Sequence, residues 1–512
     1  MSVQCKILNE ICRLLYWGEY RKYIRKQSIQ KVQSRYLMRL LKRNKATRYG
    51  EKYDFARISS YEEFARKVPL TVYEDYEPYL EAMADGEKQV LTKEDVLLFE
   101  LTSGSSGGKK KIPYTKTLKQ EFQRGIKPWL YDLYSGDREI GKGKSYWSIT
   151  PVTAEKTYTK AGIPLGFEED AEYFGFFLKI LMGKLFAVDS SVKFSEDMQH
   201  FYLDTTRQLM QCQELSLISV WNPTFLTILC DFIRDNVGLV VEGLERKEQE
   251  RIQKAVEANR FDHVFPMLRI ISCWADGSAK DYLKDLEIRF PTVHIQPKGL
   301  LATECFVSFP LLREEGSRLS VRSHFFEFRR VTDGKILLAH ELEPGEYEVI
   351  VTTGGGFYRY CIGDIVEVIK VVPDQPPIIR FLRRAGITSD LFGEKLTEEF
   401  VRGVCEKLGI TEEFCLLAPE GKRYCLYTTA EGIADKVLDD ELRESYHYNY
   451  CRQLGQLKLA KVVPVCGEPQ KVYIQRHAED GMRVGDIKPA YLTKKTDWGN
   501  WFQKRKEESE LC

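Results

Sequence analysis

Apolar residues recur three and four positions apart through the first hundred residues, and this spacing predicts amphipathic helices. The segment YRKYIRKQSIQKVQSRYLMRLLKRN, residues 20–44, shows the pattern most clearly and carries lysines and arginines on the opposite face. We interpret that basic face as a solvated helix surface.

Short apolar runs then alternate with helix-like segments between residues 96 and 370. The runs are VLLFEL, LSLISVWN, LRIISCW and VHIQPKGLLA, and the clearest helical segment between them is KTLKQEFQRGIKPWLYDLY. Alternation of this kind predicts an α/β core whose strands are buried. Two later segments, GKILLAHELEPGEYEVIVTT and GGGFYRYCIGDIVEVIK, instead predict antiparallel strands joined by Gly and Pro-Gly turns.

The segment FLRRAGITSD, residues 381–390, interrupts this pattern between two strand-like stretches. Beyond it, GEKLTEEFVRGVCEKLG predicts a helix, KRYCLYTTA a strand and QKVYIQRH another short strand. We therefore predict an α/β protein with a large N-terminal domain of mixed sheets and helices, residues 1–384. A smaller α+β C-terminal domain follows, residues 385–512.

Charge and cysteine content narrow the classes of protein that fit this pattern. Lysine plus arginine number 76 and aspartate plus glutamate 75, so no net field favours nucleic acid or a membrane surface. The thirteen cysteines form no C-x-x-C pair and the seven histidines show no metal-ligand spacing, which is typical of a reduced protein without a zinc site. No secretory signal or membrane-length apolar run is visible, so we expect a cytoplasmic protein.

The segment LFELTSGSSGGKKKIPYT sets seven small residues before three lysines. A Walker phosphate loop does not fit, because its second glycine falls on Lys109 when counting starts at Gly104. The nucleophile elbow G-x-S-x-G matches Gly104, Ser106 and Gly108, but it requires a helix directly after the serine, and Pro113 disfavours one. A hydrolase is therefore the weaker interpretation.

A third possibility is a phosphate loop of the type [ST]-[ST]-G-[ST]-[ST]-x-G-x-x-K after a buried strand. Glycines let the backbone approach a polyphosphate, hydroxyl and N–H groups bind its oxygens, and a lysine adds a compact positive charge. The loop residues are Thr102, Ser103, Gly104, Ser105, Ser106, Gly107, Gly108 and Lys111. We prefer this to a flexible linker, since the flanking VLLFEL and IPYT have the pattern of ordered strands.

Two further groups of residues would complete a nucleotide site. Thr303 and Glu304 end the strand-like VHIQPKGLLATE, where a carboxylate beside nucleotide phosphates is a natural Mg²⁺ ligand. Asp364 follows Gly363 in GGGFYRYCIGDIVEVI, where its carboxylate would accept hydrogen bonds from both ribose hydroxyls. A surface glutamate and an ordinary Gly-Asp turn are the alternatives.

The phosphate loop, the Thr-Glu pair and the motif Y-R-Y-x-[IV]-G-D, in this order and spacing, resemble the adenylate-forming enzymes. Within that group the chain is most similar to the plant auxin-responsive acyl acid-amido synthetases, the Gretchen Hagen family, and to their bacterial relatives. We expect a bacterial member. The resemblance implies ATP and Mg²⁺ as cofactors, with Lys111 and the loop on the phosphates, Thr303 at the α-phosphate and Glu304 on the metal.

The resemblance also implies roles for residues later in the chain. Tyr358 and Arg359 begin the third motif, and Asp364 is its ribose-binding carboxylate. Arg384 matches the arginine at the hinge between the two domains. Lys488, in VGDIKPAYL, matches the late lysine that a mobile C-terminal domain brings to the nucleotide, with a structural lysine as the alternative.

Two positions depart from the plant pattern. Leu300 stands where an aromatic residue often precedes the Thr-Glu pair, and Cys361 stands where the third motif has an arginine. We interpret Cys361 as a structural cysteine and not as a nucleophile. Trp221 and Trp274 fall where relatives build the acyl and adenine pockets, although core packing explains both tryptophans equally well.

The implied activity is a two-step ligase reaction. The enzyme would adenylate a small carboxylic acid, with release of pyrophosphate, and transfer the acyl group to an amine, in particular an amino acid. Backbone rotation near Arg384 and Gly386 would swing the C-terminal domain between the steps. A coenzyme A ligase and a catalytically silent nucleotide-binding protein stay open as alternatives. We expect no nucleic acid and no membrane partner, and a monomer or weak homodimer.

Overall fold

The computed structural model describes residues 3–103, 109–148, 157–166, 184–385 and most of 388–509. Within the last range it describes every residue except Asp390, Gly393, Lys395, Leu454, Gly481, Arg483, Gly485, Asp486 and Lys488. The chain divides into two compact units, Met1–Leu382 and Arg383–Cys512. No helix in these ranges is long and apolar enough to cross a membrane.

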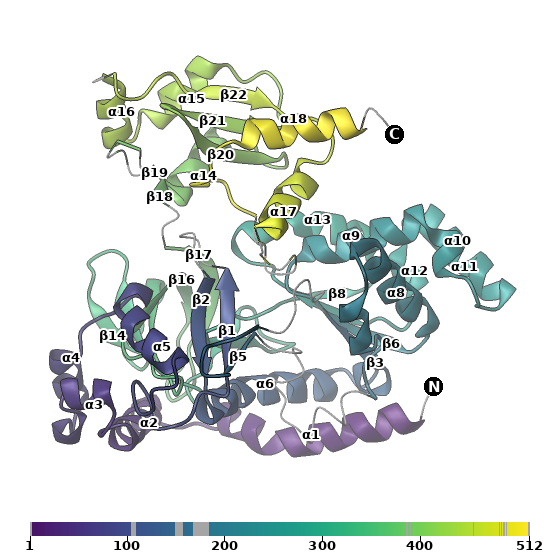
Figure 1. Cartoon of the computed structure of the whole chain (residues 1–512). Coiled ribbons are helices and arrows are strands. Elements are labelled where there is room, and N and C mark those ends of the chain that lie inside the picture. The colour runs from purple at the N-terminus through teal and green to yellow at the C-terminus, as the bar shows by residue number, and fades with distance from the viewer. Residues whose placement is uncertain are drawn as a thin grey trace. The chain divides into compact units, whose positions relative to one another are not determined.

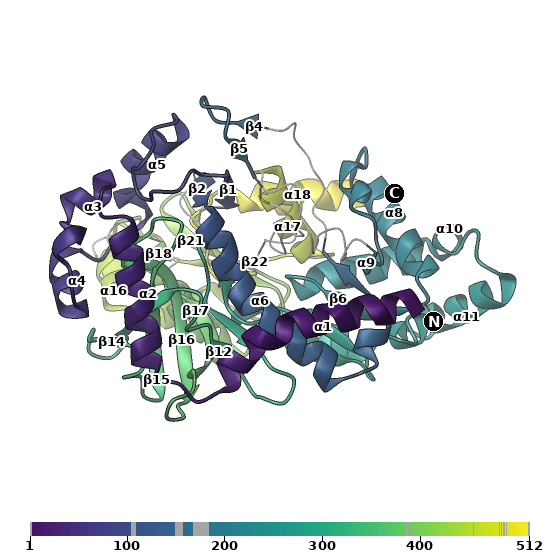
Figure 2. The same ribbon diagram turned by 90° about the horizontal axis from the view of Figure 1, so that it is seen from below.

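The first unit begins with the predicted amphipathic helices. Helix α2, Ile29–Arg43, starts where the Ser28 hydroxyl accepts the N–H of Lys31, and it buries Ile29, Gln33, Leu37, Leu40 and Leu41. Helix α1, Val3–Ile24, lies along α6, Lys116–Gly136 (Figures 1 and 2). The other helices of this part are α3, Arg48–Lys52, α4, Tyr61–Lys67, and α5, Glu77–Ala84. The helical prediction for the first hundred residues is confirmed.

A parallel sheet forms the α/β core that the alternating pattern predicts. In the described chain its order is β3-β6-β7-β8, with β3 Lys144–Trp147, β6 Leu215–Ser219, β7 Ile270–Cys273 and β8 His294–Pro297. Every residue of β6 and β7 is buried, as expected for strands composed of apolar residues and small serines. Helices lie beside this sheet (Figure 1): α8 Met198–Gln211, α9 Pro223–Asp235, α10 Val237–Val240, α11 Arg246–Glu257, α12 Phe261–Val264 and α13 Leu283–Arg289.

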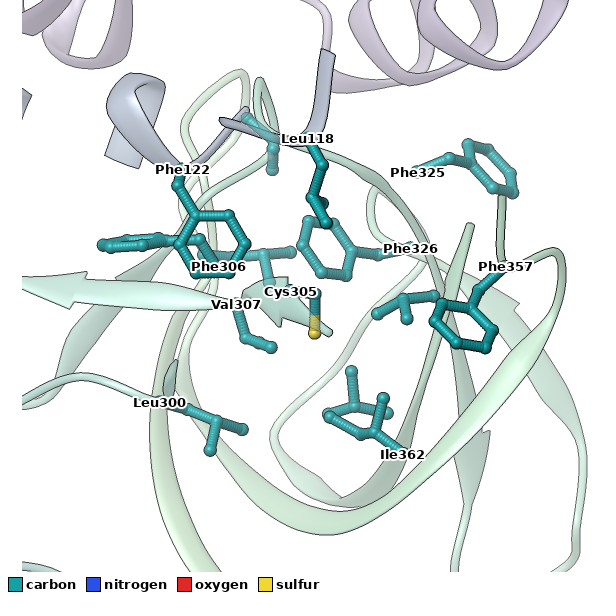
Figure 3. Packing of buried hydrophobic residues seen from close by; sticks show 14 of the residues in the cluster. Leu118, Phe122, Leu300, Cys305, Phe306, Val307, Phe325, Phe326, Phe357 and Ile362 are labelled. Atoms are coloured by element: carbon teal, nitrogen blue, oxygen red, sulfur yellow. The ribbon is translucent and has the colours of Figure 1, made fainter. Parts of the chain in front are cut away.

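A larger sheet carries the predicted antiparallel strands. Its order is β11-β12-β17-β16-β15-β13-β14, with β11 Ser308–Pro310, β12 Ser317–Leu319, β13 Phe325–Arg330, β14 Ile336–Leu338, β15 Gly345–Thr352, β16 Tyr360–Lys370 and β17 Ile378–Arg384. Leu118 and Phe122 of α6 pack against Phe306 and Phe326 in the core beside this sheet (Figure 3). Through these contacts α6 packs both on Phe306, two residues after the candidate residue Glu304, and on Phe326 of β13.

Two small sheets position the candidate loop and turn. Strands β1, Leu98–Ser103, and β2, Lys109–Tyr114, belong to a sheet of order β2-β1-β5-β4, with β4 Thr157–Tyr158 and β5 Pro164–Leu165. Strands β9, Leu301–Ala302, and β10, Cys305–Phe306, form a short hairpin. The residues VHIQPKGLLA therefore make two strands, β8 and β9, because Lys298–Leu300 between them belong to no strand.

The second unit mixes helices with a small sheet of order β20-β21-β22. Its elements are β18 Thr388–Ser389, β19 Leu396–Thr397, α14 Glu398–Lys407, β20 Cys415–Glu420, β21 Arg423–Thr428, α15 Asp435–Leu442, α16 Tyr446–Gln453, β22 Lys461–Pro464, α17 Pro469–Glu479 and α18 Trp498–Ser509. The predicted strand QKVYIQRH is wrong: it lies in α17. Pro469 starts this helix, and the buried residues Pro469, Tyr473 and His477 recur every four positions, a helical spacing.

Candidate active site

The predicted phosphate loop connects two paired strands. β1 and β2 are antiparallel, in register from Leu98 with Tyr114 to Ser103 with Lys109. Residues Gly104–Gly108 lie outside the described part of the chain, and Thr102 and Ser103 are described only as backbone of β1. A strand, and not a helix, follows the loop, which removes the structural context of a nucleophile elbow.

Lys111 lies on β2, and its backbone is fixed by Tyr73. The Lys111 N–H donates to the Tyr73 hydroxyl at 2.7 Å, and the Lys110 ammonium lies 5.0 Å from the centre of the Tyr73 ring. Burial raises the pKa of Tyr73, the Lys111 N–H opposes that rise, and the charges of Glu77 and Glu304 add to it. Glu304 is therefore close to the residue that holds the lysine strand.

Thr303 and Glu304 form the turn between β9 and β10, as the pairing of Ala302 with Cys305 requires. The Thr303 carbonyl accepts a hydrogen bond of 2.6 Å from the Tyr114 hydroxyl, which ties the turn to the end of β2. The Glu304 Oε1 atom accepts one of 3.2 Å from the Tyr360 hydroxyl. These two tyrosines position the Thr-Glu turn between the loop hairpin and β16.

Asp364 lies on β16, four residues after Tyr360, and is 6% exposed. Burial raises the pKa of Cys305 well above its ordinary value, and the carboxylates of Glu304 and Asp364 raise it further. Both carboxylates therefore lie near the same thiol. The structure thus brings Glu304, Asp364 and the strand that bears Lys111 close together, and nucleotide binding by these residues stays a prediction.

The Tyr358 side chain packs inside the fold. Its ring stacks on Tyr49 at 5.1 Å and an interplanar angle of 12°. Its hydroxyl accepts from Asn44 Nδ2 at 2.8 Å and donates to the Leu91 carbonyl at 2.9 Å. The structure thus gives this side chain a packing role, and its nucleotide contact stays a prediction.

The Arg359 side chain joins the segment before β16 to β13 and to the end of α4. Its guanidinium meets the Glu327 carboxylate at 2.8–3.1 Å, and Nη1 donates to the carbonyls of Ala65 and Val68 at 2.8 and 2.9 Å. Arg359 is 5% exposed and has a φ of 50°, the left-handed region that non-glycine residues rarely adopt. These contacts lie within the fold, so binding of the cofactor by this residue also stays a prediction.

Of the remaining predicted positions, the structure describes Arg384, Cys361 and Leu300. Arg384 is the exposed last residue of β17, next to the boundary between the units. Lys488 and Gly386 lie outside the described residues. Burial raises the pKa of the Cys361 thiol to about 11, so it is protonated at neutral pH, as a structural cysteine would be. Leu300 is buried in the core at the base of the β9–β10 hairpin (Figure 3).

A cavity of about 60 Å³ opens beside the Thr-Glu hairpin. It exceeds the roughly 10–15 Å³ that one water molecule needs. Its wall is mostly aromatic and apolar, and comes from α6, the carboxyl ends of β3 and β6, and the segment from β8 to β11. The lining residues include Phe122, Trp129, Trp147, Trp221, Leu301 and Phe306. Trp221, one of the two expected pocket tryptophans, lines the cavity, and Trp274 packs on it with ring centres 5.9 Å apart.

Comparison with known families decides the family. Residues 25–256 match the GH3 family N-terminal domain, and residues 318–384 match the GH3 family central domain. These ranges together span more than half of the chain. The chain belongs to the GH3 family. The family and the fold class predicted from the sequence are both confirmed.

Individual GH3 relatives are distant in sequence but share the fold. Indole-3-acetic acid-amido synthetase GH3.10 of Arabidopsis thaliana is 24% identical over 524 residues, which cover 83% of this chain and 86% of the relative. Jasmonoyl–L-amino acid synthetase JAR6 of Nicotiana attenuata is 22% identical over 418 residues, covering 72% and 71%. The solved structure of AtGH3.15 acyl acid amido synthetase in complex with 2,4-DB superposes with a TM-score of 0.78 at 16% identity, covering 97% of this chain and 96% of that one.

Some residues of this GH3 cavity carry no local signal in the sequence. Trp129 lies inside a helix, Trp147 ends a short strand, and Lys298 follows β8. The signal that finds them is topological, because ligands of open α/β sheets bind outside the carboxyl ends of parallel strands. The ends of β3, β6 and β8 supply Trp147, Ser219 and Lys298 to the wall.

Proposed function

We propose that this GH3 protein is an ATP-dependent acyl acid-amido synthetase, which activates a carboxylic acid as its adenylate and transfers the acyl group to an amine of an amino acid. One observation carries the proposal. The strand that bears Lys111 and the carboxylates of Glu304 and Asp364 lie close together beside a cavity whose mostly aromatic and apolar lining, with a few polar groups, is typical of small-molecule sites.

In the first step, a carboxylate oxygen of the acid attacks the α-phosphorus of ATP, and the bond from that phosphorus to the pyrophosphate oxygen breaks. The chain has to align these groups and stabilise the charge that grows on the phosphate. The Lys111 ammonium and the loop N–H groups supply positive charge there. The aromatic cavity holds the body of the acid, so that its carboxylate points towards the Thr303–Glu304 turn.

The residues near Glu304 fit a magnesium ion that is shared with nucleotide phosphates. Mg²⁺ is usually held by one or two carboxylates together with phosphate oxygens, and in its site here Glu304 would be the carboxylate. The Tyr360 hydroxyl fixes Oε1 of that carboxylate, and Asp364 lies near it. When bound, the ion would neutralise phosphate charge. Among the described residues no cluster of three His, Cys, Asp or Glu side chains is arranged to hold a metal by itself.

In the second step, the amine attacks the carbonyl carbon of the acyl-adenylate, the carbon–oxygen bond to AMP breaks, and the amine loses a proton. We propose that the C-terminal unit, with Arg384 at its start and Lys488 near its end, changes position between the two steps. Cytoplasmic location, and a monomer or weak homodimer, also belong to this proposal.

Acid-dependent exchange of labelled pyrophosphate into ATP tests the first step. A panel of carboxylic acids is assayed with wild type, Lys111→Ala and Glu304→Gln. Lys116→Ala serves as the matched control, because Lys116 is an exposed lysine at the start of α6. We expect exchange with one class of acid, and a loss of about 10²–10³-fold in Lys111→Ala, as for the removal of one oxyanion donor.

Three outcomes would contradict parts of the proposal. ATP binding without exchange for any acid would contradict catalysis. Equal losses in Lys111→Ala and Lys116→Ala would contradict the assigned role of the lysine. If a product forms only with coenzyme A and not with amino acids, the acceptor is coenzyme A, which contradicts the proposed transfer to an amine.

A further inference from the structure

A row of polar side chains lies under the aromatic cavity, at the carboxyl edge of the parallel sheet. Trp147, Ser219, Ser272 and Gln296 are paired in register across β3, β6, β7 and β8, so they point to the same face of the sheet. Trp147 and Ser219 line the cavity, which identifies that face as the cavity side. The two serines and the glutamine are at most 2% exposed.

Two polar atoms of this row lack protein partners. Among the residues that the structure describes, Ser272 Oγ and Gln296 Nε2 have no hydrogen-bond partner. Gln296 Oε1 accepts from Trp129 Nε1 at 3.0 Å, so its amide lies against a residue of the cavity wall. Buried polar groups almost always bond to protein, ordered water or ligand. Ser272 and Gln296 are not among the residues that line the cavity, so the row offers these two donors to ordered water on the cavity side.

Lys298 adds a positive charge at the same end of the cavity. Its ammonium donates to Ser219 Oγ at 2.8 Å and to the Val220 carbonyl at 2.9 Å, and it lies 4.4 Å from the centre of the Trp221 ring. These contacts hold the charge at the cavity wall. Of the described residues that line the cavity, Lys298 is the only ionisable one. Beside apolar walls, such a charge attracts an anion far more strongly than it would in water.

Lys298 stands at the opposite end of a hairpin from the candidate reaction centre. The Leu300 N–H donates to Ser308 Oγ at 2.9 Å and closes the base of the β9–β10 hairpin, while Thr303 and Glu304 form its tip. The five residue steps from Lys298 to Thr303 span at most roughly 16–18 Å, and less here, because Lys298–Leu300 belong to no strand. A substrate carboxylate at the tip leaves Lys298 near the far end of the acid.

We propose that Lys298, with Ser219 beside it, binds a second anionic group of the acid substrate. The substrate class is then an aromatic acid that carries a carboxylate or similar anion on the side of the ring away from the group that is adenylated. The tryptophans and phenylalanines of the wall contact the ring. This inference rests on the proposed function, because it takes the cavity as the acid site.

Matched acids in the pyrophosphate exchange assay test the inference. The kcat/KM for exchange is measured with three acids. They are 4-carboxyphenylacetic acid, 4-nitrophenylacetic acid, in which an uncharged planar nitro group replaces the second carboxylate, and phenylacetic acid, which carries neither group. The variants are Lys298→Met, which keeps the length of the side chain without its charge, and Lys298→Arg, which keeps the charge. For wild type we expect the diacid to be preferred over the nitro acid by about 10–100-fold, the range for a hydrogen bond to a charged group.

In Lys298→Met that preference falls to about one, while the nitro acid stays within about three-fold of wild type. Lys298→Arg retains part of the preference. A wild-type preference for the acids without a second carboxylate overturns the inference, and so does an equal loss for all three acids in Lys298→Met. The absence of a wild-type preference for the diacid overturns the inference even where a variant does not fold.

The inference and the proposed function fail in distinguishable ways. Exchange only with acids that lack a second carboxylate supports the proposed function and contradicts the inference. If no acid supports exchange, calorimetric binding of the diacid to wild type and Lys298→Met decides. Binding that depends on Lys298, without exchange, supports the inference and contradicts the proposed function, and the absence of such binding contradicts both.

Discussion

The ion pair between Arg359 and Glu327 gives the sharpest prediction about the third motif. Glu327 is 1% exposed, and apart from the guanidinium its carboxylate accepts a hydrogen bond of 2.9 Å from the Tyr61 hydroxyl. Replacing Arg359 by methionine leaves that carboxylate buried without its cation and deprives the carbonyls of Ala65 and Val68 of their donor. Breaking a buried pair in this way costs about 3–5 kcal/mol.

Urea unfolding followed by circular dichroism measures this loss. With a denaturant slope of about 3 kcal/mol per molar, the upper end for small domains, the midpoint of the N-terminal unit should fall by roughly 1–1.7 M in Arg359→Met. The double variant Glu327→Met with Arg359→Met should regain part of the loss, about 2 kcal/mol, because no uncompensated charge stays buried. Recovery is incomplete since the two carbonyls still lack a donor.

Nucleotide binding by Arg359 makes the opposite prediction. A residue that contacts ATP with its side chain would, when replaced, raise the KM for ATP and leave the urea midpoint within experimental error. A midpoint change equivalent to less than about 1 kcal/mol, together with a raised KM for ATP, would refute the structural role of Arg359. Additive losses in the double variant would also refute the assigned pairing.

Three further predictions concern packing, electrostatics and pH. Gly125→Ala should raise the KM for the acid more than that for ATP, because an added Cβ would lie 2.1 Å from a ring carbon of Phe306 on the cavity wall; equal changes in both constants would contradict this. Tyr360→Phe should lower exchange by about tenfold and raise the Mg²⁺ requirement, since Glu304 loses its hydroxyl donor; an unchanged Mg²⁺ titration would count against it. Burial, with the charge of Lys495 second, lowers the pKa of His477 from 6.5 to about 4, so the unfolded chain binds the proton first and stability falls as pH drops from about 6.5 to 4. Urea midpoints of the C-terminal unit should record a loss of about 3 kcal/mol over that range, and a loss of the same size in His477→Phe would contradict the assignment.

The core strands could be predicted because their burial is written in local pattern. β6 and β7 consist of apolar residues and a few small serines, as expected for strands buried on both faces. The segment QKVYIQRH in helix α17 has the composition of a strand, because it contains Val472, Tyr473 and Ile474 in a row. The helix start at Pro469 lies just before this segment, so the four-residue spacing of buried residues is only partly visible within it.

Side-chain roles within a motif were harder to predict. The letters of Y-R-Y do not say whether Arg359 faces a ligand or the core, because its partners at Ala65 and Val68 lie about three hundred residues earlier in the chain. The Thr303–Glu304 turn was easier, since it follows directly from a strand. Lys298 could not be found from sequence alone, because only the pairing of β8 with β7 places it at the sheet edge.

Transfer of labelled oxygen tests the two-step reaction most directly. The acid that supports exchange is prepared with ¹⁸O in its carboxylate and incubated with the enzyme, ATP and a mixture of amino acids, and the products are weighed by mass spectrometry. A carboxylate that attacks the α-phosphorus and then loses its acyl group to an amine leaves one ¹⁸O in AMP and one in the amide. We predict that distribution, with AMP and amide in equal amounts. ADP with labelled inorganic phosphate, or unlabelled AMP, would contradict the account.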